Sequence, residues 1–412
     1  MVIKSKVNLD YILAFFLFAG IWSSFSEHLT TIKTISAIAG YVFIVYFLAV
    51  KKYFPRFDKS IFLLVLAFFV SLTISALFSA DPLYSFKWIK KTYWVPLSLV
   101  GIFLFIRDKN LKIKTVLLAF IFTFFINNFY FFYKTIQVSH TVNIFSPKFI
   151  PDRNYSFYVP IFLPFALAGI IYFSNMLLRI VILVEITFGL ILLVLTGARG
   201  AYLSCMLEII LFILFVVHFL YKRYFLKYER QTIIKLIAIP LLVMLIGFAA
   251  LLNHPKVKAA FHRGLSPNGR DQIIADRFPV IFKHHPILGL GYGRQLYFRF
   301  LEEHNVPKRF GHYDKKEGRY VYHSDEGIYL QTIIRQGLLG FFVFIPLFVL
   351  SLKRSFVLSF RKSYDLNIKV FYFSLFLVMF CHYFLRGFIE TLDLGGFILF
   401  TLFISEKIWD HG

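Results

Sequence analysis

Long apolar runs recur along almost the whole chain of 412 residues. A run of about 20 apolar residues can cross the roughly 30 Å hydrocarbon core of a bilayer as a helix. Twelve such runs are found, at 11–28, 33–50, 60–80, 88–106, 113–133, 155–174, 176–196, 201–221, 232–253, 327–351, 367–386 and 391–407. We therefore expect an all-α integral membrane protein with about 12 transmembrane helices. The first run should be a retained span, because no small-residue cleavage site follows it.

The composition excludes a water-soluble globule. Of the residues, 58% are hydrophobic, 20% are aromatic and 16% are charged, whereas soluble domains are about a quarter charged. A single water-exposed domain of this length has no core large enough for 55 phenylalanines. Much of this apolar surface must therefore face lipid.

The charge balance indicates a topology. A net charge of +23, from 45 Lys and Arg against 22 Asp and Glu, would suggest a nucleic-acid partner in a soluble protein. In membrane proteins, cytoplasmic loops collect Lys and Arg. With the N-terminus inside, 22 cations fall on cytoplasmic segments, ten near outer ends and thirteen in the stretch 254–326. We expect both termini in the cytoplasm, the stretch 254–326 outside, and no nucleic-acid partner.

No internal repeat is evident, so we expect one polytopic membrane domain, 1–412, with one extramembrane insertion at 254–326. Seven of the twelve His lie in this insertion, and loops of this length are uncommon unless they are functional. Its His spacing matches no metal site, and Cys205 and Cys381 lie inside apolar runs. Neither a metal nor a cofactor is expected.

Arg199 lies in a short link between two predicted spans, with Gly197 and Gly200 beside it. It is either an interfacial anchor that reaches the lipid headgroups or an anion-binding residue. The second interpretation is favoured because no topological rule requires a cation at this outer end, and glycines allow close approach to the backbone. Arg386, with His382, is a second case of the same kind at the outer end of 367–386.

Arg270 opens a predicted surface helix in the insertion. The apolar residues that follow it at roughly helical spacing are Ile273, Ile274, Phe278, Ile281 and Phe282. Helix N-termini attract anions, so Arg270 is a candidate phosphate ligand; the alternative is that it pairs with Asp271 or Asp276. The glycines at 289, 291 and 293 predict a tight turn, because a nucleotide-binding loop would have to follow a strand.

His323 and Glu326 lie three residues apart just before the predicted span 327–351. An imidazole titrates near neutral pH and a carboxylate can orient it, so the pair is a candidate general base. The alternative is a solvated helix start, since Ser324, Asp325 and Glu326 are all favourable at helix N-termini.

In their order along the chain, these motifs resemble the O-antigen ligase / O-antigen polymerase superfamily. The resemblance covers most of the chain. It rests on about twelve spans, a Thr-x-x-Arg turn at 196–199, and one large loop after the ninth span. It also rests on a Gly-Arg pair at 269–270, a Pro-Ile-x-Gly-Leu-Gly turn at 286–291 and a Gly-x-x-Gly at 337–340.

The resemblance implies an all-helical membrane glycosyltransferase (GT-C-like) fold in the bacterial inner membrane. The implied donor is a glycan linked to undecaprenyl diphosphate, and the implied acceptor is the lipid A core oligosaccharide, both in contact with membrane lipids. Transfer would be metal-independent and would take place on the periplasmic face.

The residues suggest roles in such a transfer. Arg199 and Arg270 would clamp the diphosphate leaving group, and Arg386 would support them. The family His lies eleven residues before the first Gly of Gly-x-x-Gly, where this chain has Glu326, with His323 one helical turn earlier. Both remain candidates for the base that deprotonates the acceptor.

Three functions are therefore compared. An O-antigen ligase is favoured, and an O-antigen polymerase would use the same lipid-linked donor. A transporter of an anionic lipid-linked glycan is the alternative from another class. Transporters usually place ionisable groups near the middle of the membrane, where this chain has only Glu185 and Glu208.

Overall fold

The structure is a computed structural model. It describes residues 9–25, 29–52, 58–223, 270–308, 327–388 and 394–405, together with short stretches elsewhere. The chain divides into two compact units, each assembled from separate pieces of sequence. Unit 1 comprises Met1–Pro55, Ser98–Gly264 and Arg354–His382, and unit 2 comprises Arg56–Leu97, Leu265–Lys353 and Tyr383–Gly412. One polytopic domain with an insertion at 254–326 stays a prediction.

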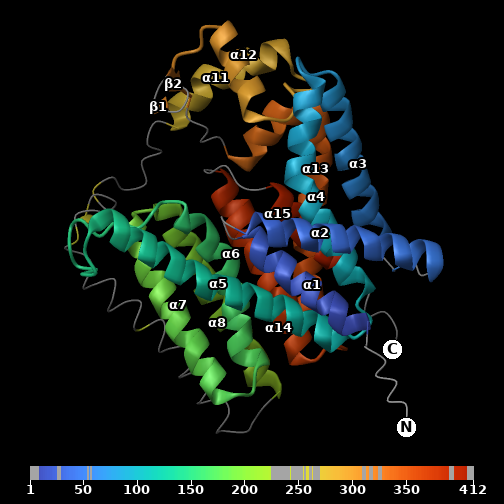
Figure 1. Cartoon of the computed structure of the whole chain (residues 1–412), viewed down its shortest axis with the longest axis vertical. Helices are drawn as coiled ribbons and strands as arrows, with labels where there is room; N and C mark the ends of the chain where they lie inside the picture. The colour runs from blue at the N-terminus through green and yellow to red at the C-terminus, as the bar shows by residue number, and fades with distance from the viewer. Residues whose placement is uncertain are drawn as a thin grey trace. The chain divides into compact units, whose positions relative to one another are not determined.

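The described part of the chain is almost entirely helical (Figure 1). Unit 1 contains α1 (Leu9–Ser24), α2 (Thr30–Val45) with its π-helical continuation η1 (Tyr46–Val50), α5 (Lys109–Ser139), α6 (Tyr155–Tyr172), α7 (Met176–Thr196), α8 (Arg199–Arg223) and α14 (Leu366–Leu377). Unit 2 contains α3 (Lys59–Leu77), α11 (Arg270–His284), α12 (Arg294–Glu303), the 3-10 turn η3 (Arg386–Phe388) and α15 (Leu394–Ser405). Residues of both units occur in α4 (Pro82–Phe105), α13 (Ile328–Phe360) and the π-helix η2 (Val378–Leu385).

Eight of the described helical segments are long and apolar enough to cross a membrane, so the all-α integral membrane class is confirmed. α1 and α15 are apolar but shorter, and the predicted span 232–253 lies outside the described residues except for Leu242. The total of about twelve spans therefore stays a prediction. The only strands among the described residues are β1 (His312–Asp314) and β2 (Arg319–Val321), which pair antiparallel.

Carboxylate and amide side chains fix where several helices begin. Asp58 accepts hydrogen bonds from the backbone N–H groups of the first turn of α3, and Asp108 does the same for α5. Asn175 caps α7 and Asp365 caps α14. Each side chain accepts from backbone N–H groups that have no partner inside the helix, and its oxygen interacts favourably with the positive end of the helix dipole. The short link between the predicted spans 155–174 and 176–196 is thus a capped turn.

Unit 1 packs largely through aromatic rings. Phe120 of α5 and Phe165 of α6 stack with ring centroids 4.2 Å apart, and Phe215 of α8 stacks on Phe373 of α14 at 3.9 Å. Stacked rings combine a large buried area with favourable ring geometry. Some of the many Phe side chains therefore form contacts between helices, and not all of them face lipid.

A buried polar network ties three helices of unit 1 together. The side-chain amide of Asn128 in α5 donates to the Glu185 carboxylate at 2.9 Å and to the Glu185 backbone carbonyl at 3.1 Å in α7. The Tyr155 hydroxyl of α6 donates to Asn128 Oδ1 at 2.5 Å and lies 3.1 Å from the Gly189 carbonyl oxygen. The mid-span carboxylate of Glu185 is therefore part of a structural network. Glu208, the other mid-span carboxylate, accepts from the Ser204 hydroxyl at 3.3 Å.

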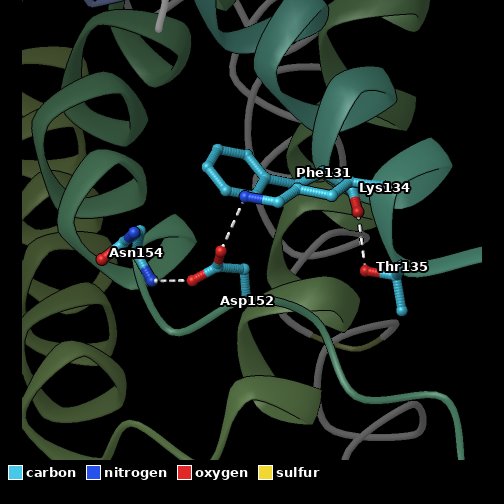
Figure 2. Close-up of polar contacts among 5 residues, drawn as sticks. All are labelled: Phe131, Lys134, Thr135, Asp152 and Asn154. Carbon is cyan, nitrogen blue, oxygen red and sulfur yellow. Dashed lines mark hydrogen bonds and ion pairs between the residues drawn. The ribbon is translucent and has the colours of Figure 1, made fainter. Parts of the chain in front are cut away.

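One ion pair joins the end of α5 to the segment before α6 (Figure 2). The Lys134 ammonium lies 2.8 Å from an Asp152 carboxylate oxygen, and the Asn154 backbone N–H donates to the other oxygen at 2.9 Å. Burial by itself would raise the pKa of Asp152, but the Lys134 ammonium and the Asn154 N–H hold it below its usual value.

In unit 2, α3, α13 and α15 share an aromatic core. The Phe344 ring of α13 lies 5.0 Å from that of Phe397 in α15 and 6.3 Å from that of Phe68 in α3. Phe348, one turn further along α13, also contacts Phe397. These contacts hold α13, which begins two residues after Glu326, against two neighbouring helices.

Candidate active site

The predicted turn at 196–199 is present between α7 and α8 in unit 1. α7 ends at Thr196, whose hydroxyl donates to the Leu193 carbonyl at 2.7 Å and accepts from the Ala198 N–H at 3.2 Å. Gly197 takes a left-handed conformation with φ of 71°, which glycine adopts without steric cost. Arg199 is the first residue of α8 and is half-buried. The turn prediction is confirmed, and the anion-binding role of Arg199 stays a prediction.

The predicted surface helix after Arg270 is also present, as α11 in unit 2. Arg270 is its first residue, as the sequence predicted, while its side chain lies outside the described part. Pro279 is accommodated inside the helix. Ile273 and Ile281 are buried, and Phe282 is exposed, so part of the apolar stripe packs on the protein itself.

The tight turn predicted at the insertion glycines joins α11 to α12. Gly289, Gly291 and Gly293 all have positive φ, at 67°, 89° and 139°, which explains why glycine occupies these three positions. The turn packs into a break in α13, where Gly337 has φ of 64° and ψ of −163°. A Cβ on Gly337 would overlap the Ile287 carbonyl.

Hydrogen bonds from this turn replace those that α13 loses at its break. In a continuous helix, the N–H groups of Leu338 and Leu339 would donate four residues back, to Ile334 and Arg335. Instead they donate to the Pro286 carbonyl at 2.8 Å and the Ile287 carbonyl at 3.1 Å. The freed carbonyls of Ile334 and Arg335 accept from the N–H groups of Leu290 and Gly291, at 2.8 and 3.2 Å. The insertion is thereby bonded to the start of a long apolar helix, and all four groups are satisfied.

Arg335 of α13 was not singled out from the sequence. Its guanidinium carbon lies 4.4 Å from the centroid of the Tyr292 ring in the glycine turn, a cation–π contact. The Ser75 hydroxyl of α3 donates to the Arg335 carbonyl at 2.5 Å. Arg335 is half-buried, and its guanidinium makes no ion pair within the described ranges. The feature of the sequence that could have drawn attention to Arg335 is its position two residues before Gly337.

His323 and Glu326 lie outside the described residues, but the residues on both sides of this segment are described. Tyr322 is 1% exposed, and its hydroxyl donates to the Val306 carbonyl at 2.8 Å. Gly327 packs so closely on the 3-10 turn η3 that a Cβ there would overlap the carbonyl oxygens of Gly387 and Phe388. Both ends of the segment that carries the candidate base are therefore fixed within unit 2.

Arg386 is the first residue of this 3-10 turn and is 2% exposed. The backbone of Gly387 and Phe388, which follow Arg386, thus lies against Gly327. That Arg386, His323 and Glu326 form one site stays a prediction. His382, four residues earlier, is also buried.

A buried arginine lies beside Tyr322 and was not singled out from the sequence. Arg277 of α11 is 1% exposed, and its guanidinium carbon lies 5.3 Å from the Tyr322 ring centroid and 5.8 Å from that of Tyr297. The Lys308 ammonium also lies over Tyr322, at 5.5 Å. Burial raises the pKa of the Tyr322 hydroxyl, Glu302 raises it further, and Arg277 acts in the opposite direction. Tyr322 is therefore a neutral hydrogen-bond donor to the Val306 carbonyl.

Three of the insertion histidines lie together. The rings of His284 and His304 have centroids 4.4 Å apart, and His285 contacts the Phe300 ring at 5.3 Å. Burial, followed by the neighbouring His284 and His304, lowers the pKa of His285. His285 is thus neutral at neutral pH, and the cluster packs against an aromatic ring.

Four of the five predicted site residues belong to unit 2, namely Arg270, His323, Glu326 and Arg386, while Arg199 belongs to unit 1. Convergence of Arg199 with the other four stays a prediction, as do the roles of all five. Within unit 2, the structure brings the η3 turn, the start of α13 and the glycine turn into one connected framework.

Comparison with known proteins gives one match. Residues 186–345 match the family model described as O-antigen ligase. This region runs from within α7 to within α13 and contains the 196–199 turn, the start of α11, the glycine turn and the break at Gly337. No match is found among curated proteins or among solved structures.

Proposed function

We propose that this multi-pass membrane protein is an O-antigen ligase, because residues 186–345 match the family model described as O-antigen ligase. It transfers a glycan from undecaprenyl diphosphate to the lipid A core oligosaccharide on the periplasmic face of the inner membrane. The observation that carries the proposal is that the matched region contains four of the five candidate site residues within one unbroken stretch, Arg199, Arg270, His323 and Glu326.

The leaving group determines the chemistry that the site must supply. As the bond between the sugar and the diphosphate breaks, negative charge accumulates on the phosphate oxygens. Arg199 and Arg270 neutralise this charge through charge-assisted hydrogen bonds, and Arg386 supports them. In such a reaction no metal is needed, because guanidinium groups stabilise the departing anion. Removing one clamping Arg is expected to slow transfer by about a hundredfold to a thousandfold, as for loss of one oxyanion donor.

The acceptor hydroxyl must lose its proton to the base. His323 or Glu326 takes this proton. In the sequence both residues lie between Tyr322, which bonds to the Val306 carbonyl, and Gly327, which packs on η3. A pH profile of transfer separates the two candidates, because unperturbed imidazole and Glu carboxyl groups titrate near pH 6.5 and about 4.3. A His323 base predicts loss of activity below about pH 6.5, and a Glu326 base predicts activity that persists about two pH units lower.

A chromosomal deletion tests the proposed function. If the protein is a ligase, the deletion strain accumulates free lipid-linked polymer and its lipid A core carries no polymer. Lipopolysaccharide with a single repeat would instead assign the polymerase reaction, and unchanged lipopolysaccharide would reject both. Complementation with Arg199→Ala or Arg270→Ala should fail although the variant protein is present in the membrane, whereas full complementation would exclude the clamp.

A further inference from the structure

The first half of α4 in unit 2 presents a surface on which cations alternate with aromatic rings. At 100° per residue, six side chains fall within about 160° of the helix circumference. The buried Ser85 and Tyr93 lie outside this arc. We call the six residues the α4 cation surface; they are Tyr84, Lys87, Trp88, Lys90, Lys91 and Trp94.

The three lysines of the α4 cation surface are exposed. The Lys91 ammonium lies 4.3 Å from the Trp88 ring centroid, and the Lys90 ammonium lies 5.5 Å from that of Trp94. None of the three makes an ion pair with a carboxylate in the part of the chain that the structure describes. Their charge is therefore available to a ligand, while the neighbouring rings hold the lysine stems in place.

The surface is joined directly to the glycine turn of the candidate site. The Ser85 hydroxyl accepts from the Tyr292 backbone N–H at 3.1 Å. Gly293 packs on the rings of Tyr84 and Trp88 so closely that a Cβ there would overlap Tyr84. Arg294, which follows, is exposed and adds a fourth cation beside the patch. The glycine turn thus contacts Arg335 through the Tyr292 ring and contacts the α4 cation surface through Gly293.

The chemistry of the surface fits a headgroup with several separated phosphates and sugar rings. Lysine ammonium groups pair with phosphate as point charges, and the faces of Trp and Tyr rings offer flat apolar surfaces to a sugar ring. The residues from Tyr84 to Trp94 cover about 15 Å along the helix at 1.5 Å per residue, which is longer than a single diphosphate. An ordinary interfacial belt of Trp and Lys would not distinguish one anionic lipid from another.

We propose that the α4 cation surface binds the phosphorylated sugar headgroup of a glycolipid in the same leaflet and presents it as the acceptor. The role of this glycolipid as acceptor rests on the proposed transfer reaction, whereas its binding to the surface does not require transfer. The lysines select the phosphates, and Tyr84 and Trp88 stack on the sugars.

Binding to the full chain in detergent tests the proposal, with added diphosphoryl lipid A as the probe and native mass spectrometry as the readout. Dephosphorylated lipid A, phosphatidylglycerol and undecaprenyl diphosphate are measured in parallel. The test variant is Lys87→Gln/Lys90→Gln/Lys91→Gln. The matched control is Lys114→Gln/Lys353→Gln/Lys362→Gln, which removes three exposed lysines elsewhere.

Diphosphoryl lipid A is expected to bind more tightly than the other three lipids. The test variant should weaken its binding about fivefold per lysine, or about a hundredfold in all, and the control should leave it unchanged. Equal loss in both variants, or equal binding of phosphatidylglycerol, would reduce the surface to a general anionic-lipid belt and overturn the proposal. Displacement of lipid A by undecaprenyl diphosphate would overturn the acceptor assignment.

The same measurement separates this inference from the proposed function. Selective binding by a protein that transfers no glycan would reject the ligase and leave the surface assigned. Transfer by a protein whose test variant binds lipid A normally would reject the surface and leave the ligase.

Discussion

Replacing Gly337 by Ala tests the joint between the glycine turn and α13. Gly337 has φ of 64° and ψ of −163°, a backbone region that is essentially restricted to glycine, and placing Ala there costs about 1–3 kcal/mol. The new Cβ would also overlap the Ile287 carbonyl, which accepts the Leu339 N–H at 3.1 Å. Losing that backbone bond, which joins two exposed residues, costs about 0.5–1.5 kcal/mol more. The expected loss of about 1.5–4.5 kcal/mol is a sizeable part of a typical unfolding free energy of about 5–15 kcal/mol.

The assay is thermal unfolding of the purified protein in detergent, followed by its intrinsic tryptophan fluorescence. Gly169→Ala in α6 is the control, because its Cβ would meet mainly the terminal methyl groups of Ile121 and Ile182, which can rotate away. If Gly337→Ala proves too unstable to purify, Ser75→Ala removes only the hydrogen bond to the Arg335 carbonyl and should cost about 1 kcal/mol. Unfolding of Gly337→Ala at the same temperature as the wild type would refute the proposed joint.

Three further predictions concern single contacts. Asn128→Ala should lower the unfolding free energy by about 1–3 kcal/mol because it leaves Glu185 without its amide donor, and equal stability in thermal unfolding would contradict this. Lys134→Met should cost at most about 1 kcal/mol. Since the pKa of Asp152 is depressed in the folded state, this ion-pair contribution is present above the usual Asp pKa of about 4 and disappears as the pH falls through the depressed value. A wild-type advantage that persists in strong acid would count against it. Arg335→Met should lose about 1–2 kcal/mol of cation–π contact with Tyr292, and Arg335→Lys should lose less, as urea titrations of both variants can show.

Local features of the fold could be predicted from the sequence because their causes are local. Hydropathy located the apolar helices, and Gly197 after Thr196 marked the end of α7. The start of α11 at Arg270 and the turn at the insertion glycines were also predicted, since an apolar stripe and closely spaced glycines act within a few residues.

Features that depend on distant residues could not be predicted in this way. The break in α13 is stable only because residues 286–291 bond to it, and no local propensity signals a bond between segments about 50 residues apart. Hydropathy favoured an uninterrupted helix there, as Gly is well tolerated in apolar spans. The close packing of Gly327 on the η3 turn and the burial of Arg277 between two tyrosines were missed for the same reason.

The break in α13 also gives a physical reason why two motifs of the sequence occur together. The Pro-Ile-x-Gly-Leu-Gly turn at 286–291 and the Gly-x-x-Gly at 337–340 are two halves of one hydrogen-bonded joint. Gly337 without the turn would leave four backbone groups unpaired, and each buried unpaired group costs about 1–3 kcal/mol. The turn without Gly337 would meet a side chain where its Ile287 carbonyl lies. Substitutions in either half should therefore act on the start of α13, which leads from Gly327, and change activity without touching a substrate.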